Sequence, residues 1–444
     1  MIISFSIKNF KSIKDQVRIS FEPDNTKGLE DYYFIEPVSG LTLLKLGLIY
    51  GANGSGKTTI LEALEFLRQL VLSPRDKKTD NLAFKPFLFD DVSFKENSEF
   101  TLKFIQEGII YKYHLEFNRE SIFNEKLEYY DSHKALVYER VTDLEKQLSS
   151  IEFGSKIKSK INKIHKGALE ANTLWNNTVL AAFLKTNFES SELKTATDWF
   201  DETLYGIVTP NSNLVRLIND GIGSGAINKK QIVTLLAAAD FRINDIVIEK
   251  QQGSYDLFKE DILKAFSSPS EFEQIYQFTT DSDKMERTSL YFKHDVEIDG
   301  EKRSYNLPFK EESQGTQRYY QFSGLMALLL NKPSVFMIDE LESSLHPDLI
   351  RHFLLIFLVN SKRSQLLLTT HYRELLLDRD ILRDDAIWFS EKKDNGSMEL
   401  YSLNDFDSSI VRNTTSIFNA YKTGKLGAVP ELGDYYVDFS DVQK

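Results

Sequence analysis

Hydrophobic residues along the chain follow patterns that predict a core of strands alternating with helices. An apolar run from Leu46 to Tyr50 enters a glycine-rich segment, and apolar residues at helical spacing follow from Ile60 to Leu67. Two more runs, Val335–Ile338 and 366–368, are apolar at successive positions and end in polar residues. Continuous apolar runs of this length are typical of parallel strands that are covered on both faces. The pattern therefore predicts an α/β core.

Alternating apolar and polar residues predict antiparallel pairs around this core. The segments expected to be strands are 3–7, 17–21, 100–105, 109–117, 245–250, 289–294, 303–307, 386–390 and 398–402. Helical spacing is expected over 142–219, 229–239, 255–278, 316–330 and 347–360. We interpret the chain as three parts, namely an N-terminal lobe (1–140), a mainly helical insertion for docking or sensing (141–285) and a C-terminal lobe (286–444).

The glycine-rich segment after the first apolar run has the spacing of a P-loop. Gly51 is followed by Gly56-Lys57-Thr58, and the segment lies between a predicted strand and a predicted helix. In such a loop the backbone N–H groups and the helix N-terminus bind phosphate, the lysine reaches the β- and γ-phosphates, and the threonine hydroxyl ligates Mg²⁺. The predicted nucleotide-binding residues here are Asn53, Gly54, Ser55, Gly56, Lys57, Thr58 and Thr59.

Two polar clusters follow the other buried strands. Asp339 and Glu340 come directly after the strand at 334–338, and His371 follows the strand at 365–369. Ligands bind at the carboxyl ends of strands in α/β sheets, so these residues are expected beside the P-loop. Asp339 is suited to hold Mg²⁺, Glu340 to deprotonate the attacking water, and His371 to sense the γ-phosphate.

A fourth segment, Glu312–Thr316, precedes a predicted helix. Ser313 resembles an N-cap, and Gly315 allows close approach of the backbone, so the helix start is a second candidate anion site. An ordinary helix cap explains the same residues.

Composition narrows the function classes. The 444 residues carry a net charge of −12, which argues against a surface generally coated with nucleic acid. There is no cysteine, so disulfides, thiolate metal sites and cysteine nucleophiles are excluded. The N-terminus lacks the features of a signal peptide, and no apolar run is long enough to span a bilayer. These features predict a cytoplasmic protein.

The order of these motifs resembles the ATP-binding-cassette branch of P-loop ATPases, specifically the RecF/SMC-like heads. That order is P-loop, signature Ser313-x-Gly315, Asp339-Glu340, the D-loop 344–347, and the switch histidine His371. The resemblance is closer still to prokaryotic AAA-type ATPases of the OLD-like and abortive-infection group, and it extends over nearly the full chain. Two departures are that no clear Q-loop stands out, and that only 73 residues follow His371. A Toprim nuclease domain is therefore not expected.

The resemblance implies a Mg²⁺-dependent ATPase with a mixed α/β fold. It also implies a head-to-tail homodimer in which Ser313 and Gly315 complete the partner's ATP site, and an effector, a nuclease or toxin, that is encoded separately and released on phage infection. Two alternatives remain open at this point: a RecF/SMC-like repair ATPase that binds DNA directly, and a transporter subunit, which the long segment between P-loop and signature makes improbable.

Overall fold

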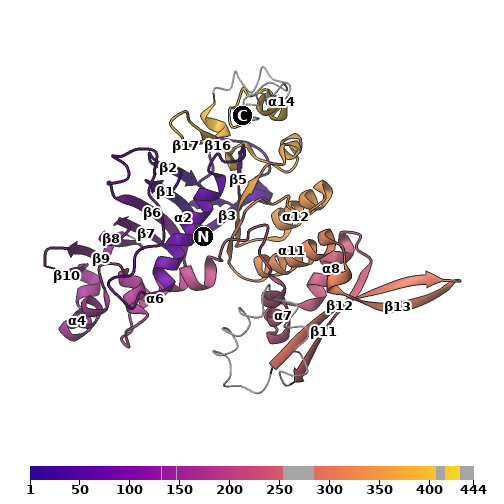
Figure 1. Cartoon of the computed structure of the whole chain (residues 1–444), viewed down its shortest axis with the longest axis horizontal. Coiled ribbons are helices and arrows are strands. Elements are labelled where there is room, and N and C mark those ends of the chain that lie inside the picture. Colours follow the sequence, from indigo (N-terminus) through magenta and orange to yellow (C-terminus); the bar gives the residue numbers. More distant parts are fainter. Residues whose placement is uncertain (132, 147, 254–284, 407–415, 431–444) are drawn as a thin grey trace, which may run out of the picture. The chain divides into compact units, whose positions relative to one another are not determined.

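The computed structural model describes residues 1–131, 133–146, 148–253, 285–406 and 416–430. The chain divides into two compact units. The first contains Met1–Ser212, Leu328–Ser343 and Ile350–Lys444, and the second contains Asn213–Ala327 and Ser344–Leu349. Figure 1 shows the elements of both units, coloured along the sequence. The three-part division at residues 140 and 285 stays a prediction.

A five-stranded sheet with the order β14-β15-β5-β16-β17 lies at the centre of the first unit. Its strands are β5 (Leu46–Gly51), β14 (Val335–Ile338), β15 (Gln365–Thr370), β16 (Ile387–Lys392) and β17 (Met398–Ser402). The pairs β14–β15, β15–β5 and β5–β16 are parallel, whereas β17 is antiparallel to β16. Every residue of β5, β14 and β15 is buried. The three predicted buried strands and the predicted C-terminal hairpin are confirmed.

Helices connect these strands. The helix α2 (Lys57–Leu72) follows β5 and contacts β5 and β15, while α12 (Pro347–Asn360) connects β14 to β15. The helix α12 has the predicted bounds, and α2 contains the predicted apolar stretch from Ile60 to Leu67 and extends beyond it at both ends. Shorter helices of this unit are α1 (Glu30–Tyr33), η3 (Arg373–Leu377), η4 (Asp384–Ala386), η5 (Leu403–Asp405) and α14 (Ile417–Lys422).

A second sheet of the first unit is antiparallel and has seven strands in the order β10-β9-β8-β7-β6-β1-β2. They are β1 (Ile2–Lys8), β2 (Val17–Ser20), β6 (Ser98–Gln106), β7 (Ile109–Phe117), β8 (Ile122–Tyr130), β9 (Lys134–Asp143) and β10 (Leu148–Phe153). Alternating burial along β7 shows that one face packs inward. On that face Phe66 of α2 packs against Phe100 and Phe117, so the sheet is anchored to the P-loop helix.

The predicted hairpin at 100–117 is confirmed as β6 and β7. The prediction that helix begins at residue 142 is wrong, because β9 continues to Asp143 and β10 follows it. Ile151 and Phe153 are buried and alternate with exposed or half-buried residues, which is the period of a strand. Within the segment predicted to be helical, the first helix begins after Gly154. The helices of this segment are α3 (Ser155–Lys158), α4 (Lys163–Asn172), α5 (Val179–Phe183), α6 (Ser191–Asp198) and the π-helix η1 (Trp199–Thr203).

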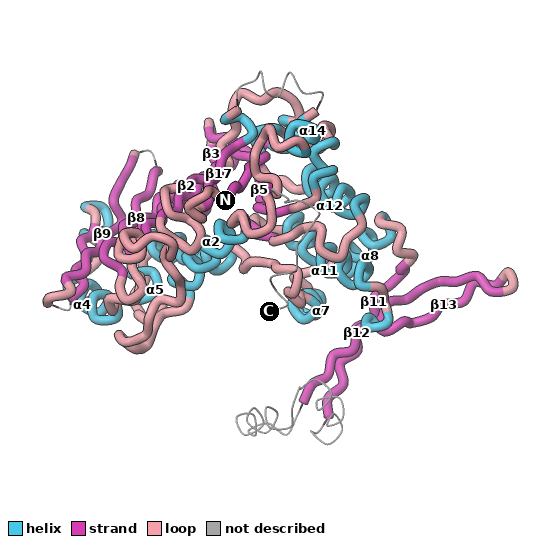
Figure 2. The backbone as a smooth tube through the Cα atoms, turned by 45° about the horizontal axis from the view of Figure 1, so that its top comes forward, coloured by secondary structure: helices cyan, strands magenta, loops and turns pink. Residues whose placement is uncertain are grey.

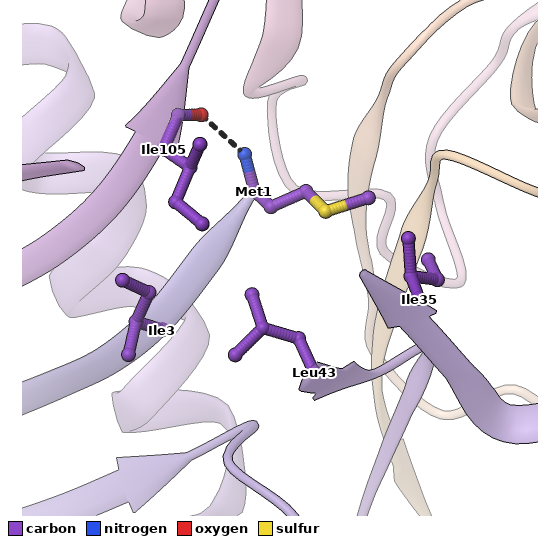
Figure 3. Packing of buried hydrophobic residues seen from close by; sticks show 5 residues of the cluster. All are labelled: Met1, Ile3, Ile35, Leu43 and Ile105. Carbon is purple, nitrogen blue, oxygen red and sulfur yellow. Dashed lines mark hydrogen bonds between the residues drawn. The ribbon is translucent and has the colours of Figure 1, made fainter. Parts of the chain in front are cut away.

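A small sheet of β3 (Phe34–Val38) and β4 (Leu41–Leu44) completes the first unit. Its side chains Ile35 and Leu43 join Met1, Ile3 and Ile105 in one buried cluster (Figure 3). The Met1 amino group donates a hydrogen bond of 2.7 Å to the Ile105 carbonyl oxygen. The cluster therefore holds the small sheet against the antiparallel sheet.

The second unit combines helices with a three-stranded sheet. Its helices are α7 (Val215–Ser224), α8 (Lys229–Ala238), the short η2 (Phe309–Glu311) and most of α11 (Gln314–Asn331). The strands β11 (Ile243–Gly253), β12 (Met285–Ile298) and β13 (Glu301–Pro308) are antiparallel in sequence order (Figure 2). The strands predicted at 245–250, 289–294 and 303–307 are confirmed, whereas the helix predicted at 255–278 lies outside the described residues. Within the part of the chain that the structure describes, no helix is both long and apolar enough to cross a membrane.

Candidate nucleotide-binding site

The P-loop connects the buried end of β5 to the first turn of α2. Gly54 and Gly56 have φ angles of 75° and 100°, a region that glycine adopts without strain. A Cβ atom on Gly51 would lie 2.4 Å from the carbonyl oxygen of Ser390 and 2.6 Å from Oγ of Ser55. The backbone of this loop therefore requires glycine at the first position of the motif for a packing reason that the motif alone does not reveal.

Lys57 is the first residue of α2 and only 5% of its surface is exposed. Its Nζ donates hydrogen bonds of 2.9 Å to the carbonyl oxygens of Gly51 and Ala52, and it lies 3.4 Å from Nδ1 of His371. Burial lowers the pKa of Lys57 to about 8, and the negative charges of Glu342, Asp339 and Glu340 act in the opposite direction. Lys57 and His371 are thus brought together, as their positions after neighbouring strands predict.

Asp339 faces the hydroxyl of Thr58 across the site. The Thr58 Oγ1 donates to the carboxylate, with distances of 3.0 Å and 3.1 Å to its two oxygens. Hydroxyl and carboxylate oxygens are the hard ligands that Mg²⁺ prefers, so the pair fits this ion. Among the described residues there is no group of three or more His, Cys, Asp or Glu side chains that could hold a metal ion.

Thr369 links the two carboxylate positions of the site, and the sequence analysis missed it. Its hydroxyl donates to Oδ1 of Asp339 at 2.6 Å and accepts a hydrogen bond of 2.9 Å from the backbone N–H of Glu340. The φ angle of Glu340 is 49°, a left-handed conformation that is rare outside glycine. Backbone strain of this kind concentrates at functional sites, where the surrounding contacts enforce it.

Glu342 is a third carboxylate at this edge, and the sequence analysis missed it too. It accepts a hydrogen bond of 2.7 Å from the Thr370 hydroxyl and another from the backbone N–H of His371. Of the three carboxylates, it also opposes the lowering of the Lys57 pKa most strongly. In the sequence, its position two residues after Glu340 could have indicated that it lies at the site.

The remaining P-loop residues fall into two groups. Asn53 and Gly54 are exposed, whereas Ser55 and Thr59 are buried. The Thr59 hydroxyl lies 2.9 Å from the Ser12 hydroxyl, and the Ser390 hydroxyl donates to the carbonyl oxygen of Ser55 at 2.8 Å. The Ser55 Oγ itself is buried without a hydrogen-bond partner among the described residues.

Ser313 and Gly315 belong to the second unit, at the start of α11. The Ser313 hydroxyl accepts a hydrogen bond of 3.1 Å from the backbone N–H of Thr316 and lies 2.8 Å from the Thr316 hydroxyl. This contact caps the start of α11. A Cβ atom on Gly315 would be 3.6 Å from the Ser344 carbonyl oxygen, an ordinary contact distance. The predicted N-cap is therefore present.

Two solved structures with 14% identity and a TM-score of 0.40 are the "SMC head domain from Thermotoga maritima" and the "SmcHead bound to the C-winged helix domain of ScpA". The first alignment covers 90% of this chain and 98% of that chain, and the second covers 95% and 99%. No curated protein matches the sequence significantly.

A family profile matches residues 48–378, which is more than half of the chain. Its description is "AAA domain, putative AbiEii toxin, Type IV TA system". The matched span contains the P-loop, Asp339, Glu340, Glu342 and His371. The chain belongs to this family of AAA-domain ATPases.

Proposed function

We propose that this protein binds and hydrolyses ATP as a switch that controls a separately encoded effector, a nuclease or toxin, in an abortive-infection-like antiphage system. One observation above all supports the binding and hydrolysis of ATP. Lys57, Thr58 and Asp339 meet at the carboxyl edge of the buried parallel strands. The family description names a toxin and a type IV toxin–antitoxin system, which supports the proposed control of an effector.

In the proposed reaction, the residues of this edge bind, orient and accept a proton. Backbone N–H groups of the glycine-rich loop bind the phosphates, and Lys57 neutralises charge on the β- and γ-phosphates. Thr58 and Asp339 would hold Mg²⁺, which supplies further neutralisation of phosphate charge when it is bound. Glu340 accepts a proton from the attacking water, and His371 contacts the γ-phosphate.

Glu342 has a positioning role in this proposal. It binds the Thr370 hydroxyl and the backbone N–H of His371, so it fixes the chain that carries the histidine. Because hydrolysis of this kind depends on positioning and charge neutralisation, small displacements of His371 alter the rate strongly.

The proposed active assembly is a head-to-tail homodimer. In it, Ser313 and Gly315 of one copy approach the nucleotide that Lys57 and Thr58 of the other copy hold. The capped start of the 18-residue helix α11 supports this proposal, because a helix N-terminus favours phosphate. Two-fold symmetry would give two equivalent sites, and ATP binding would close the dimer.

The variant Glu340→Gln tests the proposal. We expect ATP affinity to be retained, hydrolysis to slow by about 100-fold or more, and the closed dimer to accumulate, because the base is lost while the binding groups remain. Hydrolysis is measured by phosphate release and the dimer by light scattering. Glu374→Gln, which changes a partly exposed carboxylate paired with Arg373 on η3, is the matched control.

Hydrolysis at the parental rate in Glu340→Gln would show that another group is the base. Control of an effector is tested by co-purification of this protein with the products of neighbouring genes, with and without ATP. A nuclease or toxin that binds in one nucleotide state and not in the other supports the proposal. Tight, salt-sensitive binding of duplex DNA by the isolated protein would instead favour a repair ATPase.

A further inference from the structure

The first unit contains a cavity of about 1060 Å³ at the edge of the five-stranded sheet that lies opposite the P-loop. Lys45, Pro333 and Arg363 line it, and they lie just before the first residues of β5, β14 and β15. These strands are parallel, so residues that precede them share one edge and residues that follow them share the other. The cavity is therefore separate from the nucleotide-binding edge.

Basic side chains enter this cavity from the loops before three neighbouring strands. They are Lys45, Lys332, Lys362 and Arg363. None forms an ion pair with a described residue, although Lys332 lies over the ring of Tyr205. The lining carboxylates come from the surrounding elements, and they are Asp31, Glu36, Glu107 and Glu202. The cavity thus has basic groups at the sheet edge and acidic groups on its other walls.

Lys45 is the buried member of the basic group, with 4% of its surface exposed. Its Nζ donates one hydrogen bond of 2.9 Å, to the carbonyl oxygen of Leu358 at the end of α12, although an ammonium group has three N–H donors. Burial lowers the pKa of Lys45, and the nearby charge of Lys362 lowers it further. No carboxylate of a described residue compensates this charge, which is costly for a buried ammonium group.

Ser361 gives a second, independent observation at the same end of the cavity. The residue is fully buried, it lines the cavity, and its Oγ has no hydrogen-bond partner among the described residues. Its backbone N–H is already used, since it donates to the carbonyl oxygen of Phe357. Buried hydroxyl groups normally have a partner, so this one is available to a ligand.

We infer that the cavity is a second ligand site, in which Lys45, Ser361 and Lys362 bind the phosphate group of a small phosphorylated molecule. The free N–H donors of Lys45 and the Ser361 hydroxyl donate to phosphate oxygens, and Lys362 adds charge. Several cations that form no ion pair with a described residue match a phosphate, which carries nearly two charges, better than a single carboxylate group.

The other walls fit the remainder of such a molecule. Phe34, Ile35 and Pro37 provide apolar surface, and carboxylates such as Glu202 accept hydrogen bonds from hydroxyl or amino groups. The volume lies at the upper end of what small-molecule sites measure, about 300–1,000 Å³, so it has room for such a molecule. Binding at this edge requires none of the residues of the P-loop edge, so the inference stands or fails independently of the proposed function.

The test uses the full chain with Lys57→Ala, which weakens phosphate binding at the P-loop. Titration calorimetry with pyrophosphate should show saturable binding to one site per chain. Adding Lys45→Met or, separately, Lys362→Ala should weaken it about tenfold or more, because each removes a charged donor. Lys393→Ala, which changes a partly exposed lysine paired with Glu399 in the β16–β17 hairpin, should leave it unchanged.

Three results would overturn the inference. One is the absence of saturable pyrophosphate binding up to about 10 mM, a concentration that corresponds to negligible affinity. Another is binding that neither Lys45→Met nor Lys362→Ala weakens. The third is binding of citrate, a carboxylate probe, with no binding of phosphate or pyrophosphate. Because Lys362 is exposed, its variant keeps the test decisive even if Lys45→Met unfolds the protein.

Discussion

The two edges of the five-stranded sheet each hold a buried lysine, in opposite electrostatic surroundings. Lys57 follows β5 at the P-loop edge, and Lys45 precedes β5 at the other edge. Burial lowers the pKa of both side chains. Carboxylates such as Glu342 counteract this at Lys57, whereas Lys362 reinforces it at Lys45.

The two edges differ in whether negative charges counteract the burial of the lysine. At the P-loop edge carboxylates oppose the effect of burial on Lys57, and hydrogen bonds hold its ammonium group close to His371. At the opposite edge Lys45 lacks a negative partner, and the inferred phosphate would supply one. Preorganised charges suit a catalytic site, because they cost little reorganisation during the reaction.

The largest expected effect is that of Lys57→Ala on ATP binding. The variant removes the ammonium group that we propose contacts the β- and γ-phosphates. Charged hydrogen bonds of this kind justify an expected loss of about 100-fold or more in affinity. Equilibrium dialysis with ATP measures it. Lys11→Ala is the control, because it changes a lysine whose ion-pair partner is Glu62 on α2. This variant should bind ATP with normal affinity. Unchanged affinity in Lys57→Ala would exclude the P-loop as the ATP site.

The pH dependence of ATP affinity is the next largest effect. The pKa of Lys57 is lowered to about 8, so the free protein loses this charge as the pH rises through that value. Affinity should be insensitive to Lys57 below this pH and should fall above it, by up to about tenfold per pH unit. Dissociation constants measured from about pH 7 to 9.5 test this range. Lys57→Met should lack this decline, and an equal decline in that variant would assign it to another group.

Glu342→Gln should move this decline to lower pH. The substitution removes the carboxylate charge that counteracts burial most strongly at Lys57, so the lysine loses its proton earlier. At about pH 8 we expect affinity to fall about threefold relative to the parent protein, a small free-energy change. The same titration measures it, with Glu374→Gln as the control. A decline at the same pH in both variants would show that Glu342 does not act on Lys57.

The smallest effect is expected at the opposite edge, from Lys45→Met on stability. The variant loses the hydrogen bond to the Leu358 carbonyl oxygen but also removes a buried charge without a counter-ion. These effects offset each other, so the free energy of unfolding should change by less than about 1 kcal/mol. Urea denaturation measures it. A loss above about 3 kcal/mol would mean that Lys45 mainly stabilises the end of α12.

The sequence by itself determined the nucleotide edge. A P-loop between a strand and a helix, and polar residues directly after two apolar strands, predict Lys57, Thr58, Asp339 and His371 as neighbours. The physical reason is that parallel strands place their carboxyl ends at one edge, so a position in the sequence becomes a position in space. The bounds of α11 and α12 follow similarly, to within two residues, from their apolar spacing.

Only the tertiary structure revealed Thr369 as a bridge between Asp339 and the Glu340 backbone, and Glu342 as the partner of the His371 backbone. Their roles depend on hydrogen bonds between segments about thirty residues apart, which no periodic pattern encodes. The cavity at Lys45 and Ser361 was likewise revealed only by the tertiary structure. Its residues lie far apart in the sequence, and only the packing of the sheet places a buried ammonium with a single hydrogen bond beside a buried hydroxyl that has no partner among the described residues.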